Sequence, residues 1–238
     1  MSRLQSELHR LYLPMPGTAE TAGVRAMVME LAAPPNWAAL SGVWRGVQSE
    51  LELPAPGIAV SGTDGIQLWF SLAEPVSSER AHEFLELLRS SFMPDVDGGR
   101  VRLMTALQAA PVPALQQWTG NWSAFIASDL APVFAETPWL DFESNEEGQA
   151  ALLRGLEAMK APAFEAAFKR LSASAAPVVS DAEVPAATRV PAKLGEPGSG
   201  ERPDAARRFL LQVMDDESAP LALRVEAAKA LLAHSTGR

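Results

Sequence analysis

Alternating hydrophobic and polar positions predict a β-hairpin within residues 57–75, GIAVSGTDGIQLWFSLAEP. An apolar run at 58–60 enters the turn sequence SGTDG, and a second apolar run at 66–72 leaves it. The Asp-Gly step favours a tight hairpin because both residues tolerate positive φ. In the second run, Gln67 and Trp69 alternate with larger apolar residues and therefore face the opposite side of the strand. Pro75 is expected to end this strand.

Hydrophobic periodicity elsewhere predicts helices where apolar residues recur every three or four positions, and strands where short apolar runs lie between Gly or Pro. Asn36 and either Ser77 or Ser78 are expected to cap helices. The predicted elements are a helix at 2–12, a strand at 24–31, a helix at 36–50, the hairpin, a helix at 78–91, a strand at 100–107, and helices at 146–159 and 163–171. This order predicts an α+β fold with a mixed β-sheet and flanking helices.

Composition divides the chain into three parts. Residues 1–171 form the α+β body, whereas residues 172–203 are rich in Ala, Pro, Ser, Gly and Val, and contain no aromatic residue. That composition predicts a flexible linker. Residues 204–238 have the pattern of two short amphipathic helices, too few residues for a core of their own. We expect this helical hairpin to dock on the body or on a protein partner.

The cysteine and histidine content, the net charge and the length of the apolar runs limit the kinds of site and partner that we expect for this chain. The chain has no cysteine and three histidines that lie far apart in sequence, so disulfides and zinc sites built on cysteine are excluded. Its net charge of −9 disfavours general nucleic-acid binding, which draws on basic surface, although a local basic groove remains compatible with it. No apolar run approaches the ~20 residues needed to span a bilayer. We therefore expect no membrane association and a cytoplasmic location.

The order of elements and the hairpin residues Ser61, Gly62, Gly65 and Trp69 resemble the archaeo-eukaryotic primase-polymerase superfamily over roughly residues 20–145. In that family the first strand carries an Asp-x-Asp pair that holds two divalent metals. A hairpin of the form Ser-Gly-x-x-Gly-x-His-x-Trp contacts the phosphates of the incoming nucleotide, and a third acidic residue lies further on. The resemblance implies a nucleotide site at this hairpin.

The sequence departs from the family pattern at the residues that carry catalysis. Gln67 stands where the family has histidine and cannot carry positive charge toward a phosphate. Glu30 is the only acid in the strand at 24–31, and Asp141 is the candidate third acid. Glu30 and Asp141 are thus the candidate catalytic residues, with Glu30 the candidate ligand for Mg²⁺ or Mn²⁺ if a nucleotide is bound. A single carboxylate does not make a two-metal site, so we expect a degenerate member without catalysis.

Two arginines on one face of the strand at 100–107 are candidate phosphate contacts. Arg100 and Arg102 are equally placed to pair with Asp95 and Asp97, and we favour the pairing. The candidate nucleotide-binding residues are Ser61, Gly62, Gly65, Gln67, Trp69 and Arg102. The alternative is an ordinary hairpin whose glycines form the turn and whose tryptophan packs in the core.

These observations predict a non-catalytic, primase-polymerase-like accessory protein that binds a nucleotide, a nucleic acid or a protein partner in replication or mobile-element biology. One alternative is an active metal-dependent primase or nucleotidyltransferase that uses Glu30 and Asp141. Another is a purely structural interaction protein that acts through its C-terminal helical hairpin. That hairpin resembles segments of phage-related small terminase proteins through its Phe209–Met214 and Arg224–Ala230 stretches.

Overall fold

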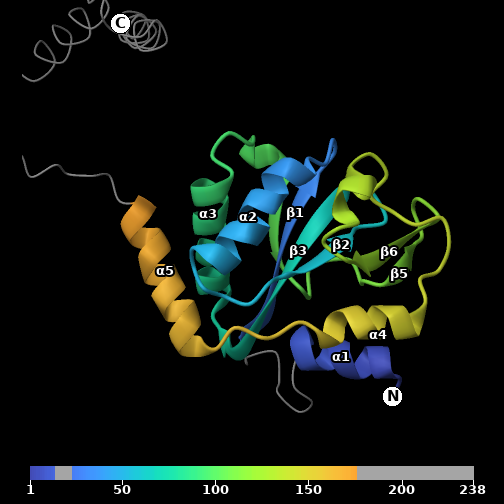
Figure 1. The fold of residues 1–238 in the computed structure, drawn as a ribbon, viewed down its shortest axis with the longest axis horizontal. Helices are drawn as coiled ribbons and strands as arrows, with labels where there is room; N and C mark the ends of the chain where they lie inside the picture. The colour runs from blue at the N-terminus through green and yellow to red at the C-terminus, as the bar shows by residue number, and fades with distance from the viewer. Residues whose placement is uncertain (14–22, 176–238) are drawn as a thin grey trace, which may run out of the picture. The chain divides into compact units, whose positions relative to one another are not determined.

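A computed structural model describes residues 1–13 and 23–175 of the chain as an antiparallel β-sheet with helices packed on both faces (Figure 1). The strand order is β4-β1-β3-β2-β6-β5. The strands are β1 (Val24–Ala32), β2 (Gly57–Val60), β3 (Gly65–Val76), β4 (Val101–Thr105), β5 (Ala114–Gln116) and β6 (Asn121–Ile126). Each strand pairing is antiparallel, and one isolated parallel bridge joins Leu72 to Met159. The predicted α+β class with flanking helices is confirmed, but the sheet is antiparallel in all its ladders where a mixed sheet was predicted.

The two faces of the sheet carry separate hydrophobic cores. The helices are α1 (Arg3–Leu11), α2 (Trp37–Ser49), α3 (Ser78–Phe92), α4 (Glu146–Arg154) and α5 (Ala161–Ala175), with short 3₁₀ turns η1 (Gly98–Arg100) and η2 (Ala131–Ala135). Helices α2, α3 and α5 pack on the face of β3 that bears Ile66, Leu68 and Phe70. Helices α1 and α4 pack on the opposite face, around Trp69. The alternation read from the hairpin sequence is therefore confirmed, because successive side chains of a strand point to opposite faces.

The observed N-caps of α1, α2 and α3 confirm where these helices were predicted to start. The Ser2 hydroxyl accepts from the Gln5 N–H to start α1, the Asn36 side chain accepts from the Ala39 N–H to start α2, and Ser77 does the same for α3. Each cap satisfies a backbone N–H that has no partner inside the helix.

Some predicted element boundaries are wrong, and two strands were not predicted. β3 runs through Pro75 to Val76, which pairs with Val24 beyond a register shift. α4 ends at Arg154 with Gly155 as its C-cap, and the chain beyond it is tied to β3 by the Met159 N–H, which donates to the Ser71 carbonyl. The short strands β5 and β6 lie in a region to which the sequence analysis assigned no element.

The C-terminal part of the chain is described only as far as α5. That helix continues to Ala175, four residues beyond the predicted end of the body at 171. The rest of the predicted linker and the helical hairpin at 204–238 lie outside the described residues. Among the helices that are described, none is long and apolar enough to cross a membrane.

Candidate functional site

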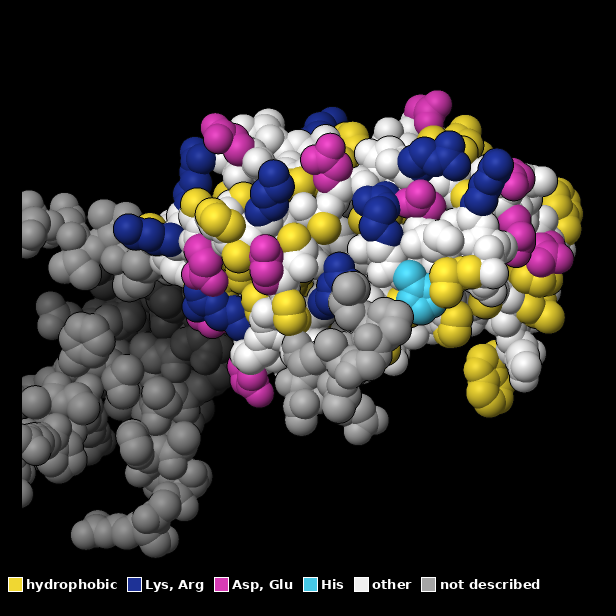
Figure 2. Space-filling model, turned by 90° about the horizontal axis from the view of Figure 1, so that it is seen from below, with side chains coloured by type: hydrophobic (Ala, Val, Ile, Leu, Met, Phe, Trp, Pro, Cys, Tyr) yellow, Lys and Arg dark blue, Asp and Glu magenta, His cyan; other side chains and the backbone are white. Residues whose placement is uncertain are grey.

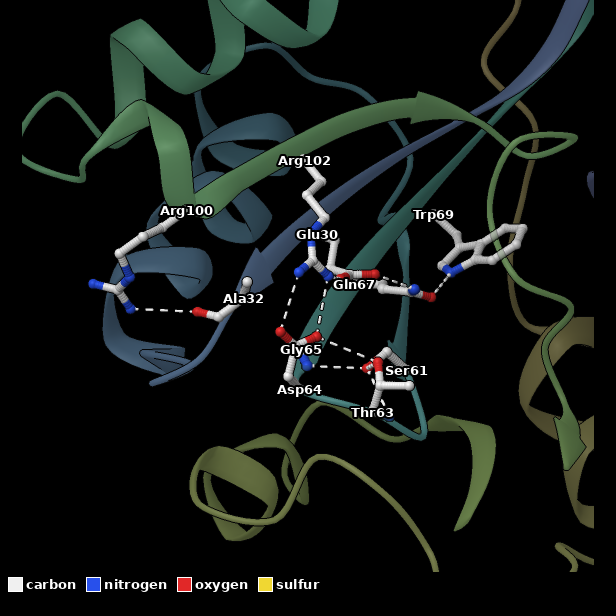
Figure 3. A network of polar contacts seen from close by, with 10 residues as sticks. All are labelled: Glu30, Ala32, Ser61, Thr63, Asp64, Gly65, Gln67, Trp69, Arg100 and Arg102. Atoms are coloured by element: carbon white, nitrogen blue, oxygen red, sulfur yellow. Dashed lines mark hydrogen bonds and ion pairs between the residues drawn. The ribbon is translucent and has the colours of Figure 1, made fainter. Parts of the chain in front are cut away.

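The candidate site lies where β1, β3 and β4 run side by side next to the β2–β3 turn (Figure 3). The sheet register places Glu30 of β1 opposite Gln67 of β3 on one side and opposite Arg102 of β4 on the other. Side chains that face each other across neighbouring strands lie close enough to interact directly. The register thus gathers three of the predicted site residues into one place.

A chain of hydrogen bonds joins these side chains. The Trp69 indole N–H donates to Gln67 Oε1 at 2.8 Å, and Gln67 Nε2 donates to Glu30 Oε2 at 2.6 Å. Arg102 Nη1 forms an ion pair with Glu30 Oε1. The Glu30 side chain is only 6% exposed, and both of its carboxylate oxygens have a donor within the protein. A buried carboxylate requires such partners, because burial without them is strongly unfavourable.

Arg102 also binds a second carboxylate. Its Nη1 and Nη2 donate to the two carboxylate oxygens of Asp64 at 3.0 and 3.1 Å, a bidentate geometry. The hydrogen bond from Arg102 holds the pKa of Asp64 below its usual value, and the hydrogen bond to Asp64 raises the pKa of Arg102. The group of Glu30, Asp64 and Arg102 contains two acids and one base. When all three are ionised it carries net negative charge and has little to offer a phosphate.

The turn itself is organised by Ser61. The Ser61 hydroxyl accepts from the backbone N–H of Thr63 at 3.1 Å and of Gly65 at 3.0 Å. The Ser61 N–H in turn donates to the Gly65 carbonyl at 2.9 Å. Ser61 is buried, so its polar groups hold the turn together.

The two glycines of the candidate motif permit close packing. A Cβ on Gly65 would lie 2.8 Å from Glu30 Cγ, and a Cβ on Gly62 would lie 2.8 Å from the Ser123 backbone nitrogen. Gly62 also has φ +76°, a conformation that suits glycine. Its N–H donates to the Pro138 carbonyl at 3.0 Å. Packing therefore accounts for both glycines without a ligand.

Trp69 lies inside the protein, 4% exposed. Its ring packs edge-on against Tyr12 and Phe125, with ring centroids 5.2 and 5.6 Å away. Burial raises the pKa of the Tyr12 hydroxyl well above its usual value. Trp69 therefore packs in the core and holds the buried Gln67 in place.

The favoured pairing of Arg100 and Arg102 with Asp95 and Asp97 is wrong. Arg102 reaches across the sheet to Glu30 and Asp64. Arg100 ends the 3₁₀ turn η1 and donates from Nη2 to the backbone carbonyls of Ala32, at 3.4 Å, and of Pro34. Asp97 instead caps η1 by accepting from the Gly99 N–H. The strand starts at Val101, one residue later than expected, so the arginines belong to different elements.

Asp141 lies apart from the hydrogen-bonded chain of side chains. It is exposed and follows Leu140, which forms an isolated bridge with Trp122 of β6. Asn145, not Asp141, caps the following helix α4. No polar contact within the described residues links Asp141 to Glu30 or to Gln67.

The donor set does not fit the two metals of the family site. Within the described residues, no group of three or more His, Cys, Asp or Glu side chains could hold a metal ion. The two nearby carboxylates, Glu30 and Asp64, are joined by the Arg102 guanidinium. Its positive charge stands where a cation would have to enter, so a metal would first have to displace this arginine.

Sequence reasoning identified Glu30, Gln67 and Arg102 but missed the role of Asp64, which it assigned to the turn alone. Because an Asp-Gly step is already explained as a hairpin signal, nothing in the sequence indicated that Asp64 also forms an ion pair with Arg102.

On the face shown in Figure 2, basic and acidic side chains are interspersed over the coloured surface, without a continuous basic band among them. A search of protein-family models finds no match to this chain, and a search of curated proteins finds none either.

Proposed function

We propose that this chain is a non-catalytic, primase-polymerase-like protein that binds a nucleotide or a partner as an accessory factor in replication or mobile-element biology. The observation that carries the proposal is the engagement of Glu30. Both of its carboxylate oxygens are held by Arg102 and Gln67, and Asp64 is held by the same arginine.

The chemistry of phosphoryl transfer explains why this arrangement argues against catalysis. Two metal ions stabilise the attacking and leaving oxygens, and acidic side chains must be free to bind those ions. In this protein a guanidinium neutralises the acid that the resemblance assigns to the metals. A guanidinium is a fixed hydrogen-bond donor and cannot coordinate substrate oxygens as a metal does. The ion pair between Arg102 and Glu30 is compatible with the packing of β1 against β4, but it leaves Glu30 without a free oxygen for a metal ion.

Binding remains chemically possible at the outer side of the site. The Arg102 side chain is 50% exposed, whereas Gln67 is buried and its amide is engaged by Trp69 and Glu30. A ligand at this side of the site would therefore contact Arg102 and not Gln67. On the face shown in Figure 2 the charges are interspersed, and the net charge of −9 disfavours the basic surface that a nucleic-acid backbone needs. These features favour a small nucleotide or a protein partner over a long nucleic acid.

A primer-extension assay tests the non-catalytic part of this proposal. With Mg²⁺ or Mn²⁺, nucleoside triphosphates and a primed template, we expect no incorporation above a blank, because Glu30 is committed to Arg102. The matched variants are Glu30→Ala and Asp141→Asn, which remove the two candidate acids one at a time. Metal-dependent incorporation that disappears in Glu30→Ala would refute the proposal, and loss in both variants would favour the active enzyme.

A further inference from the structure

A hollow lies beside the candidate site, where the end of β1 meets the start of α2 and the turns η1 and η2. It is an open hollow of about 440 Å³, a volume within the range of small-ligand pockets. Trp37, Arg100, Pro34 and Pro132 are among the residues that line it. We call this hollow the Arg100 pocket. Ala32, which accepts a hydrogen bond from Arg100, lies two residues beyond Glu30 on β1.

The charge of the Arg100 pocket is opposite to that of the neighbouring site. Arg100 is the single ionisable residue in the lining, which includes no carboxylate. Within the described residues Arg100 has no acidic partner and donates only to two backbone carbonyls. Its buried Nε has no hydrogen-bond partner among these residues. Arg102, by contrast, is shared between two carboxylates. Arg100 is therefore the better anion-binding group of the two.

Apart from Asn36, which caps α2, the rest of the lining is apolar. Trp37 is partly buried and packs against the core below α2, while part of it faces the pocket with Pro34 and Pro132. Aromatic rings bind nucleobases by stacking and do so with little dependence on the base. A cation next to an aromatic and proline surface matches a ligand that has a phosphate at one end and a planar ring at the other.

We propose that the Arg100 pocket binds a mononucleotide, with the phosphate on Arg100 and the base against Trp37. This inference rests on the proposed function and gives it a location outside the hairpin that the resemblance indicates. One pocket of this volume with one uncompensated cation suits a single nucleotide. A longer strand would extend over an acidic body, which repels its phosphates.

Calorimetric titration of the full chain with AMP and ATP, in EDTA and at low salt, tests the proposal. We expect saturable binding by the wild type and a loss of affinity of about tenfold or more in Arg100→Ala, since a charge-assisted hydrogen bond is removed. Arg100→Lys should retain part of the affinity, and Trp37→Leu should weaken binding of AMP more than binding of inorganic phosphate. Arg154→Ala, which removes an exposed charge at the end of α4, is the matched control and should bind like the wild type.

The outcomes separate this inference from the proposed function. If the wild type binds nucleotide and both Arg100 variants and Trp37→Leu bind equally well, the Arg100 pocket is not the site, although nucleotide binding stands. If the wild type binds neither AMP nor ATP, both nucleotide binding and the pocket assignment fail. If only a 5′-phosphorylated oligothymidylate binds, the assignment to a mononucleotide is overturned. Binding of adenosine as tight as that of AMP would exclude a role for Arg100 in phosphate recognition.

Discussion

Replacing Gly62 by alanine is expected to lower the free energy of unfolding of the body by about 3 kcal/mol. Gly62 has φ +76°, which an L-residue adopts at a cost of roughly 1–2 kcal/mol. The added Cβ would also lie 2.5 Å from Gln116 Cγ and 2.8 Å from the Ser123 backbone nitrogen. The backbone of β6 cannot move away without disturbing its pairing with β5 and β2, so overpacking adds to the conformational cost.

Gly120 is a matched control for this change. Its φ of +75° is nearly the same, but nothing lies within 4 Å of the position that its Cβ would take. We therefore expect Gly120→Ala to cost only about 1 kcal/mol, the conformational part alone. Urea unfolding followed by circular dichroism measures both variants. Equal losses in the two variants would mean that the β2–β3 turn and β6 are not packed as closely as described.

Replacing Arg102 by alanine is expected to lower the free energy of unfolding by about 2 kcal/mol at pH 7. The change leaves the buried Glu30 carboxylate with Gln67 as its remaining partner. Removing one member of a fully buried ion pair costs roughly 3–5 kcal/mol, and the half exposure of Arg102 reduces this, because water can reach the vacated space. The measurement is the shift of the urea midpoint at constant slope.

Two further variants assign this loss to the ion pair. Adding Glu30→Gln to Arg102→Ala removes the uncompensated charge, and we expect it to restore most of the stability. Arg3→Ala breaks a pair with Glu147 in which both side chains are largely exposed, and should change stability by less than about 0.5 kcal/mol. If Arg102→Ala costs no more than Arg3→Ala, Arg102 does not neutralise a buried Glu30.

The hairpin and its two faces were predictable because they depend on residues that are close together in the sequence. A period of two places Ile66 and Leu68 against one core and Trp69 against the other, whatever the rest of the chain does. The caps Asn36 and Ser77 are local in the same way. These signals account for most of the predicted elements.

The interactions of the arginines were not predictable from local patterns. Arg102 meets Glu30, seventy-two residues away, through the pairing of β4 with β1, and nothing near either residue specifies that register. Pro75 illustrates a second limit. β2 pairs with β3 only as far as Trp69, so the missing N–H of Pro75 costs no hydrogen bond to β2, and the strand continues past it.

Because Arg102 and Gln67 hold both carboxylate oxygens of Glu30, we expect Glu30 not to bind a metal ion. The most direct test is a titration with Mn²⁺ that follows the indole N–H signal of Trp69 by NMR, assigned with Trp69→Phe. This N–H donates to Gln67, which donates to Glu30, and a paramagnetic ion bound at Glu30 would broaden the signal. We predict that the Trp69 signal keeps its intensity and position. Selective broadening that EDTA reverses and that Glu30→Gln abolishes would contradict the account.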